Sequence, residues 1–328
     1  MQIPTIPNNP HASFQAQFHQ RWNHLNDPHV RTLAWLLDAP DLLNPDALQW
    51  RGRIAMLKAN ASTEAEAWLV DLDRAPASLH AYLAAQHCSR LGRYAEKLMA
   101  FYFQHMGMLV AHGVQVQAAK NDTVGEFDFL LRDGAALVHW EFATKFYLLE
   151  SSGAGLHADY FVGPNLADTL GAKMQKILDR QLALAQHPAA QIHLPQPVAS
   201  AQALVKGWLF YHDDDPPPIQ SLGVSDTHCR GFWCVPGELD AIPGERYVVL
   251  PRLSWLAPAK VDVLQTLNRQ SLLAMLTAHF ARDTMPVLVA VVDRQGDHAI
   301  ETNRGFFVPD DWRTRAGNRT PHAIVTIG

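Results

Sequence analysis

Two extended segments separated by a short polar break constrain this chain more than any other feature. The segments run over 125–131 and 136–149, and the break is Arg132-Asp133-Gly134. This spacing is typical of two neighbouring strands joined by a hairpin turn. Each strand carries a carboxylate, Asp128 or Glu141, among bulky apolar residues. A carboxylate in such surroundings is costly unless it is paired or binds a cation, so we expect the fold to bring these two groups together.

The alternation of side chains along each strand predicts which groups share a face. On the first strand, Glu126 and Asp128 are expected on one face, and Phe127 and Phe129 on the other. On the second strand, one face is expected to carry His139, Glu141, Ala143 and Lys145, and the other Trp140, Phe142, Thr144 and Phe146. Each strand would then bring one carboxylate to the same face of the sheet.

The segments around this hairpin predict a mixed α/β core. Apolar residues at helical spacing indicate a helix over 91–105. The other expected elements are strands at 109–118 and 203–211 and a helix at about 166–186, with Asn165 as its N-cap. The predicted order is therefore a helix, three strands, a helix and a strand, within a core domain at 89–212.

The segments outside this core are predicted to form two further regions. Residues 1–88 are expected to be a mainly helical N-terminal region with tryptophan anchors, interrupted by prolines. The acidic and proline-rich run at 212–218 is expected to be a linker rather than a metal cluster. Residues 213–328 are expected to form a mixed α/β extension, with strands near 231–235, 247–250, 286–292 and 305–308 and a helix at 260–280. The sequence leaves open whether these strands extend the first sheet or form a second unit.

Composition and charge narrow the function classes. Hydrophobic residues make up 48% of the 328 residues, which is typical of a globular protein with a sizeable core. The net charge of -5 means that any phosphate-binding surface must be local. Three cysteines do not form a disulfide framework, and His228-Cys229 with Cys234 lacks the second ligand pair of a zinc site. With neither a signal peptide nor a sufficiently long apolar run, we expect a cytoplasmic protein that does not contact the membrane.

The two strand carboxylates suit a hard divalent cation. Asp128 and Glu141 offer the oxygen ligands that Mg²⁺ or Mn²⁺ prefers, and such an ion can polarise a phosphodiester and activate water. Lys145 is a candidate for stabilising the charge that develops during attack. Glu96 lies within a helix that is apolar nearly all round, and Gln181 lies within an apolar helical stripe, so both need a partner. Glu126 and His139 are interpreted as structural.

In these residues the sequence resembles the PD-(D/E)XK nuclease superfamily. The helix glutamate, the aspartate strand and the third-strand acid of that superfamily correspond to Glu96, Gly125-Glu126-Phe127-Asp128 and Glu141. The resemblance implies a restriction-endonuclease-like αβββαβ core and metal-dependent cleavage of DNA or RNA. It also implies that Glu96 assists the metal site and that Gln181 positions it.

The superfamily lysine is displaced in this chain. It should stand two residues after Glu141, where Ala143 is found, and Lys145 lies two residues further along. At about 3.3 Å per residue, Lys145 stands roughly 13 Å from Glu141 along the strand, against about 7 Å for the usual pair. Either the lysine has migrated or the site binds without cutting.

The wider chain resembles an uncharacterised bacterial family, domain of unknown function 1853. The resemblance rests on four segments, namely Arg93-Tyr94-Ala95-Glu96, Thr123-Val124-Gly125-Glu126-Phe127-Asp128, residues 139–148 and Gly163-Pro164-Asn165.

Three functions from different classes remain open at this point. The first is a Mg²⁺- or Mn²⁺-dependent phosphodiester hydrolase with nucleic acid as its partner. The second is a catalytically inactive nuclease-fold module that binds nucleic acid or a protein. The third is a protein-interaction scaffold whose contact surface is the tryptophan-rich N-terminal helices.

Overall fold

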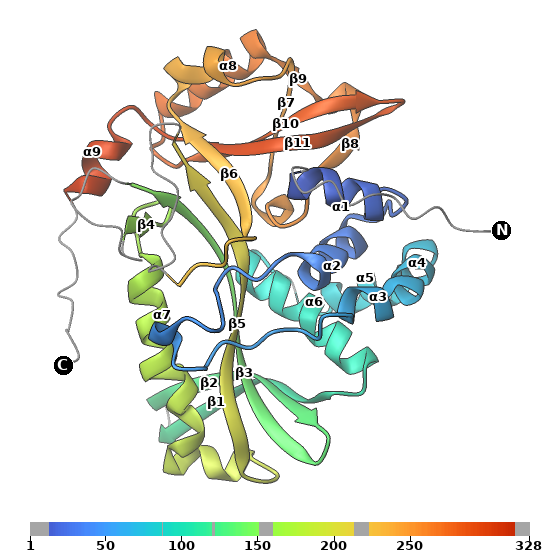
Figure 1. Cartoon of the computed structure of the whole chain (residues 1–328), viewed down its shortest axis with the longest axis vertical. Coiled ribbons are helices and arrows are strands. Elements are labelled where there is room, and N and C mark those ends of the chain that lie inside the picture. Colours follow the sequence, from blue (N-terminus) through green and yellow to red (C-terminus); the bar gives the residue numbers. More distant parts are fainter. Residues whose placement is uncertain (1–12, 87, 120–121, 151–159, 213–222, 319–328) are drawn as a thin grey trace.

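A single large sheet organises the chain (Figure 1). The computed structural model describes residues 13–86, 88–119, 122–150, 160–212 and 223–318. Its sheet has 11 strands in the order β1-β2-β3-β5-β6-β11-β10-β7-β9, with β4 paired to β3 and β8 paired to β11. The acidic and proline-rich run after His212 lies outside the described residues. Among the described residues, no helix is long and apolar enough to cross a bilayer.

The central segment has the predicted mixed α/β character, with a short strand, β4, added between the third predicted strand and the helix. Its elements are α6 (Leu91–His105), β1 (Leu109–Ala119), β2 (Asp122–Asp133), β3 (Ala136–Leu149), β4 (Phe161–Val162), α7 (Leu170–Asp179) and β5 (Val198–Tyr211). β1, β2 and β3 form an antiparallel meander, and β5 pairs with β3 in parallel. A parallel pair needs a long crossover connection, and this one contains α7.

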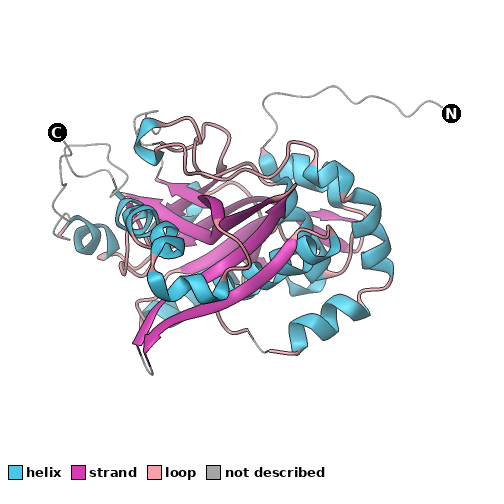
Figure 2. Cartoon of the chain, turned by 90° about the horizontal axis from the view of Figure 1, so that it is seen from below, coloured by secondary structure: helices cyan, strands magenta, loops and turns pink. Residues whose placement is uncertain are grey.

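Helices cover both faces of the sheet (Figures 1 and 2). The N-terminal helices α1 (Phe14–Trp22), α2 (Pro28–Asp38), α3 (Ala61–Glu64), α4 (Glu66–Arg74) and α5 (Ala77–Ala84) lie with α6 on one side, and α7 lies on the other. β5 shows why both faces need cover: Leu204 and Trp208 belong to the core under the N-terminal helices, and Val205 and Leu209 to the core under α7. A strand with apolar residues on both faces must be buried on both sides.

Three of the four tryptophans of the N-terminal region are buried core residues, and Trp68 is partly buried against the core that contains Trp22 and Trp35. Trp22 and Trp35 are fully buried and Trp50 is 4% exposed. Trp35 stacks on Trp208 of β5, with ring centroids 6.3 Å apart. Trp35 therefore helps to attach α2 to the sheet.

The C-terminal strands continue the first sheet, which answers the question that the sequence left open. β6 (Cys229–Cys234) pairs in parallel with both β5 and β11 (His298–Phe307). The remaining elements are β7 (Arg246–Val249), β8 (Lys260–Asp262), β9 (Leu267–Asn268), α8 (Arg269–Phe280), β10 (Val287–Gln295) and α9 (Trp312–Gly317). Short 3-10 helices complete the described chain: η1 (Leu48–Trp50), η3 (Gln181–Gln186), η4 (Pro188–His193), η6 (Pro236–Ala241), η7 (Arg252–Ser254) and η8 (Val263–Gln265).

Two helix boundaries differ from the sequence prediction. The helix expected from 260 begins only at Arg269, because Lys260–Asp262 pairs with β11 and Asn268 caps the helix. The helix expected over 166–186 begins at Leu170, where the Thr169 hydroxyl accepts a hydrogen bond from the Ala172 N–H. Asn165 is not the N-cap, because Leu166 after it has a positive φ of 60°. The helix also ends at Asp179, and η3 follows it.

Candidate active site

A cleft of about 910 Å³ opens between α6, the β2–β3 hairpin and α7. Four of the five sequence-predicted site residues line this cleft: Glu96, Asp128, Lys145 and Gln181. The fifth, Glu141, is 2% exposed and is held in the wall by two side-chain partners. The structure thus brings together residues from two helical segments and two strands.

Asp128 lies where the pairing between β2 and β3 ends. The ladder runs from the hairpin turn to the pair Phe129↔Trp140, and Asp128 is the next residue of β2. Its Oδ2 accepts a hydrogen bond from the Phe142 N–H at 2.9 Å. The carboxylate therefore satisfies a backbone donor that the partner strand no longer reaches, and this fixes its position.

The face alternation predicted for β2 is wrong at this point. Phe129 packs on Phe103 of α6, with ring centroids 5.2 Å apart. Phe127 instead packs on His139 at 4.8 Å and belongs to the small core around Leu184. The two phenylalanines lie on opposite faces, because β2 shifts its alternation by one residue where it leaves the ladder.

The alternation predicted for β3 is confirmed. Trp140 packs on Phe103 of α6, with ring centroids 5.8 Å apart. Ala143 and Tyr147 belong to the core under α7. The same parity directs Glu141 toward the α7 side, where its Oε2 accepts a hydrogen bond from Gln181 Nε2 at 2.5 Å.

His139 is a partner of Glu141 that sequence reasoning treated as merely structural. It is fully buried, and its Nε2 lies 3.0 Å from Glu141 Oε1. Burial, with the charge of Arg53, lowers the pKa of His139 to about 4. The imidazole is therefore neutral at pH 7 and donates its Nε2–H to the carboxylate. Both oxygens of Glu141 are thus oriented by hydrogen-bond donors. Position 139, two residues before Glu141 on the same strand face, was the sequence signal for this contact.

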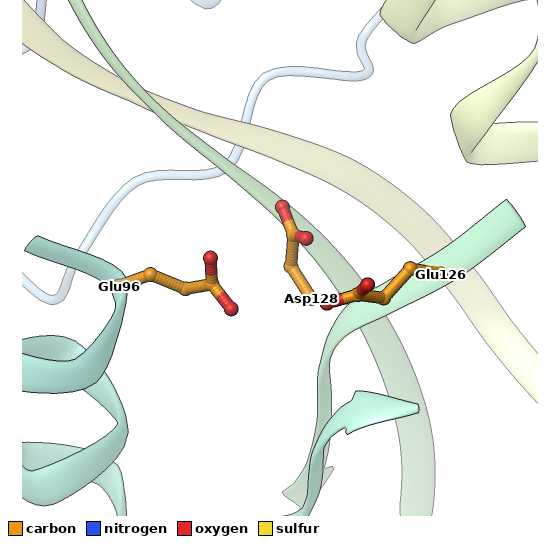
Figure 3. A group of neighbouring side chains, drawn as sticks. All are labelled: Glu96, Glu126 and Asp128. Carbon is orange, nitrogen blue, oxygen red and sulfur yellow. The ribbon is translucent and has the colours of Figure 1, made fainter. Parts of the chain in front are cut away.

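Two further carboxylates gather around Asp128 (Figure 3). Glu96 points from α6 and Glu126 from β2 toward Asp128, and one oxygen from each of the three lies within 4.8 Å of the others. Arg93 Nη1 lies 2.7 Å from an oxygen of both Glu96 and Glu126. His112 Nε2 lies 2.8 Å from Glu96 Oε1. Arg93 was missed from sequence as a site residue, although it precedes Glu96 by one helical turn.

Burial and crowding hold protons on the two central carboxyls. Burial raises the pKa of Asp128 to about 8, and the charges of Glu141 and Glu96 add to this effect. Burial likewise raises the pKa of Glu141 to about 7, against the opposing influence of the Lys173 charge and of a hydrogen bond with Asp128. These groups titrate as a pair, and a divalent cation is the kind of charge that would displace their protons.

The donor chemistry fits a hard cation. Asp128, Glu141, Glu96 and Glu126 offer only carboxylate oxygens, which suit Mg²⁺ or Mn²⁺. Asp128 belongs to the cluster with Glu96 and Glu126, and its charge also interacts with that of Glu141.

The ammonium of Lys145 pairs with a carboxylate outside this group. Its Nζ lies 3.6 Å from Asp168 Oδ2, which also accepts a hydrogen bond from the Tyr147 hydroxyl at 3.0 Å. Burial and the charge of Lys173 lower the pKa of Lys145, whereas Asp168 raises it. Lys145 therefore lines the cleft but interacts with a different carboxylate from the one predicted.

Lys173 of α7 is a second lysine of the cleft, and its charge interacts with the central carboxylates. Burial and the charge of Lys176 lower the pKa of Lys173, whereas Glu141 and Asp128 raise it. Its Nζ lies 3.5 Å from Gln181 Oε1. Sequence reasoning missed it, although it lies one turn after Leu170, at the edge of the predicted helical stripe that contains Gln181.

The family model described as Domain of unknown function (DUF1853) matches residues 31–308 of this chain. The chain belongs to this family. No curated protein and no solved structure matches it. The DUF1853 segment contains the cleft residues from α6 to η3 and the strands beyond them, so the site lies within the family's own domain.

The cleft of this DUF1853 chain is locally basic although the whole chain is acidic. Its walls carry six basic side chains against three acidic ones, among the described residues that line it. The basic ones come from α6 or the segment before it (Arg90, Arg93), from β3 (Lys145) and from α7 or just after it (Lys173, Lys176, Arg180). The carboxylates thus lie between basic side chains on the walls of the cleft. This arrangement suits an anionic substrate.

Proposed function

We propose that this chain is a metal-dependent phosphodiester hydrolase with a PD-(D/E)XK-type core that acts on DNA or RNA. The observation that carries the proposal is the position of Asp128. It stands at the end of the β2–β3 ladder, in electrostatic interaction with Glu141 and close to Glu96 and Glu126, in a cleft with basic walls.

Asp128 and Glu141 are the residues that would hold Mg²⁺ or Mn²⁺. When bound, the ion would polarise a phosphodiester and supply a water of lowered pKa. Glu96, fixed by Arg93 and His112, adds negative charge beside Asp128. Gln181 and His139 orient the two oxygens of Glu141, which holds the carboxylate ready to bind. Raised pKa values for the two acids favour this interpretation, because strongly shifted groups gather at functional sites.

The basic walls support a polyanionic substrate. Lys176 and Arg180 are exposed at the cleft, and Arg93 is 45% exposed at its side chain. Such residues bind phosphates without reading base sequence, so the cleft chemistry favours a nucleic-acid backbone over a small neutral substrate.

The test is cleavage of linear, circular and single-stranded DNA and of RNA by the purified chain, with Mg²⁺, with Mn²⁺ and with EDTA. We expect cleavage only with metal, and a loss of at least about 100-fold in rate for Asp128→Asn and Glu141→Gln. Asp133→Asn on the exposed hairpin end of β2 is the matched control. Metal-dependent cleavage that survives Asp128→Asn unchanged would refute the assignment.

A catalytically inactive binding module is the second candidate, and the position of Lys145 favours it. Ala143 occupies the usual lysine position, and Lys145 pairs with Asp168 instead of facing the carboxylates. Calorimetry separates the two candidates. Salt-sensitive nucleic-acid binding without any Mg²⁺ or Mn²⁺ heat would select the binding module.

A further inference from the structure

α7 brings one lysine toward the carboxylates from the wall opposite α6. Lys173 is half-buried, whereas Lys176 and Arg180 further along are exposed. Met174 and Ile177 pack α7 onto the sheet, so the direction of Lys173 is set by a rigid element rather than by a loop. The basic wall therefore has one half-buried residue, Lys173, and two exposed residues, Lys176 and Arg180.

The side-chain amide of Gln181 lies between this lysine and Glu141, with its oxygen toward the lysine and its nitrogen toward the carboxylate. Its Oε1 faces Lys173 Nζ at 3.5 Å, and its Nε2 donates to Glu141 Oε2 at 2.5 Å. A carbonyl can only accept and an amide NH₂ can only donate, so reversing the amide would break both contacts. The ammonium and the carboxylate are therefore held in fixed relation to each other through one side chain.

The electrostatic partners of the two candidate lysines overlap at Asp168 but differ at the central carboxylates. The charge of Lys173 interacts with Glu141, Asp128 and Asp168, whereas that of Lys145 interacts with Asp168. The ammonium of Lys145 faces Asp168, to which the Tyr147 hydroxyl also donates. Of these two lysines, Lys173 is thus the cation placed to act at Asp128 and Glu141.

We propose that Lys173 is the catalytic cation of this site and takes the role that the sequence pattern suggested for Lys145. The inference rests on the proposed phosphodiesterase function. In the reaction, the oxygen of a water forms a bond to phosphorus while the bond from phosphorus to the leaving oxygen breaks. The attacking water loses a proton to solvent, and the leaving oxygen takes one from solvent. The Lys173 ammonium keeps its protons and stabilises the extra negative charge on a non-bridging phosphate oxygen.

The experiment compares Lys173→Met and Lys145→Met in two measurements. Lys58→Met is the matched control, because Lys58 is exposed and does not line the cleft. Single-turnover cleavage is measured at saturating metal, and Mn²⁺ affinity is measured separately by calorimetry without nucleic acid. Thermal melts establish that each variant is folded.

We expect Lys173→Met to lower the single-turnover rate constant by at least about 100-fold and Lys145→Met by less than about 10-fold. Lys173→Met should also tighten Mn²⁺ binding several-fold, because a cation that repels the metal has been removed. Lys173→Arg keeps the charge and should restore most of the rate.

If the wild-type chain cleaves, two results would overturn the assignment while the hydrolase proposal stands. One is a larger loss of the rate constant in Lys145→Met than in Lys173→Met. The other is an Mn²⁺ affinity that Lys173→Met leaves unchanged. A wild-type chain that binds no metal and cleaves nothing overturns the proposed function and this assignment with it.

Discussion

Asp128 combines a structural and a chemical role in one side chain. It accepts the Phe142 N–H that β2 no longer pairs, and it carries a pKa raised to about 8 by burial and by its acidic neighbours. The hydrogen bond keeps the carboxylate in place, and the burial makes its ionised form costly. The residue is therefore positioned before any cation arrives, and a cation is needed to relieve the cost of its charge.

Metal binding should depend steeply on pH. The carboxyls of Asp128 and Glu141 hold protons below pKa values of about 8 and 7, and a metal binds only their ionised forms. Mn²⁺ affinity should therefore rise between about pH 6 and pH 8, by up to about tenfold per pH unit for each proton released. Calorimetry in two buffers of different ionisation enthalpy would count those protons. An affinity that is flat over this range, with no proton release, contradicts the prediction.

Stability without metal should change with pH in the opposite sense. A carboxyl whose pKa is raised in the folded state binds its proton more tightly there than in the unfolded chain. The resulting stability is complete below the ordinary pKa near 4 and is lost as the pH rises through 8. Asp128→Asn cannot ionise, so in EDTA at pH 8 it should raise the free energy of unfolding by roughly 1–3 kcal/mol.

Urea unfolding at pH 6 and pH 8.5 measures this difference, and Asp133→Asn at an exposed position is the control. An Asp128→Asn variant that is less stable than the parent chain at pH 8.5 would show that the ionised carboxylate is satisfied without a cation.

α7 and Arg180, which follows it, have one side that packs on the sheet and one side that carries basic residues. Met174, Ile177 and Leu178 face the sheet, whereas Lys176 and Arg180 are exposed at the cleft. The apolar stripe fixes the helix against β3 and β5, and this in turn fixes the basic wall. Substitutions on the basic side of α7 should therefore change nucleic-acid binding without changing how the helix packs.

Reversing the outer charges of this wall should weaken nucleic-acid binding and leave the fold intact. We expect Lys176→Glu/Arg180→Glu to lower the affinity at least about tenfold at low salt and to reduce the slope of log K against log salt by about 2. Fluorescence anisotropy in EDTA from 50 to 200 mM salt would measure both quantities. Lys58→Glu/Arg74→Glu makes the same change of charge at two exposed positions outside the cleft and controls for net charge. Equal losses in both variants would show that only the overall charge matters.

At the scale of the whole molecule, the site is built on a sheet that continues through the C-terminal strands. Arg304 of β11 is fully buried, pairs with Glu301 and lies over the Trp208 ring of β5 at 4.1 Å. It also donates to the backbone oxygen of Ala257 at 2.8 Å. One guanidinium therefore joins the strand next to the site to the C-terminal part of the sheet.

Removing this guanidinium should destabilise the chain as a whole. Arg304→Met leaves Glu301 buried without its partner and should lower the free energy of unfolding by about 3–5 kcal/mol. Glu301→Gln in the same chain should recover part of the loss, because the orphaned charge is gone. Chemical denaturation followed by fluorescence and by circular dichroism gives the measurement. A variant with parental stability would show that this pair does not hold the sheet together.

The sequence by itself determined several local elements and the hairpin whose strands carry Asp128 and Glu141. The helix at 91–105 and the strand at 136–149 are observed with their predicted bounds, because helical and strand periodicity are local properties. The short polar break predicts the hairpin, and the hairpin places Asp128 one residue beyond its last pair, Phe129↔Trp140. Neither result needs information from distant parts of the chain.

Only the tertiary structure decided how the groups around those acids are arranged. The shift of alternation at Asp128 depends on where β2 leaves β3. The choice of Lys173 over Lys145 depends on how α7 crosses the sheet and on Asp168 meeting Lys145. The continuation of the sheet depends on β6 pairing with β5. Each outcome rests on contacts between residues from different elements, and periodicity within one segment carries no information about such contacts.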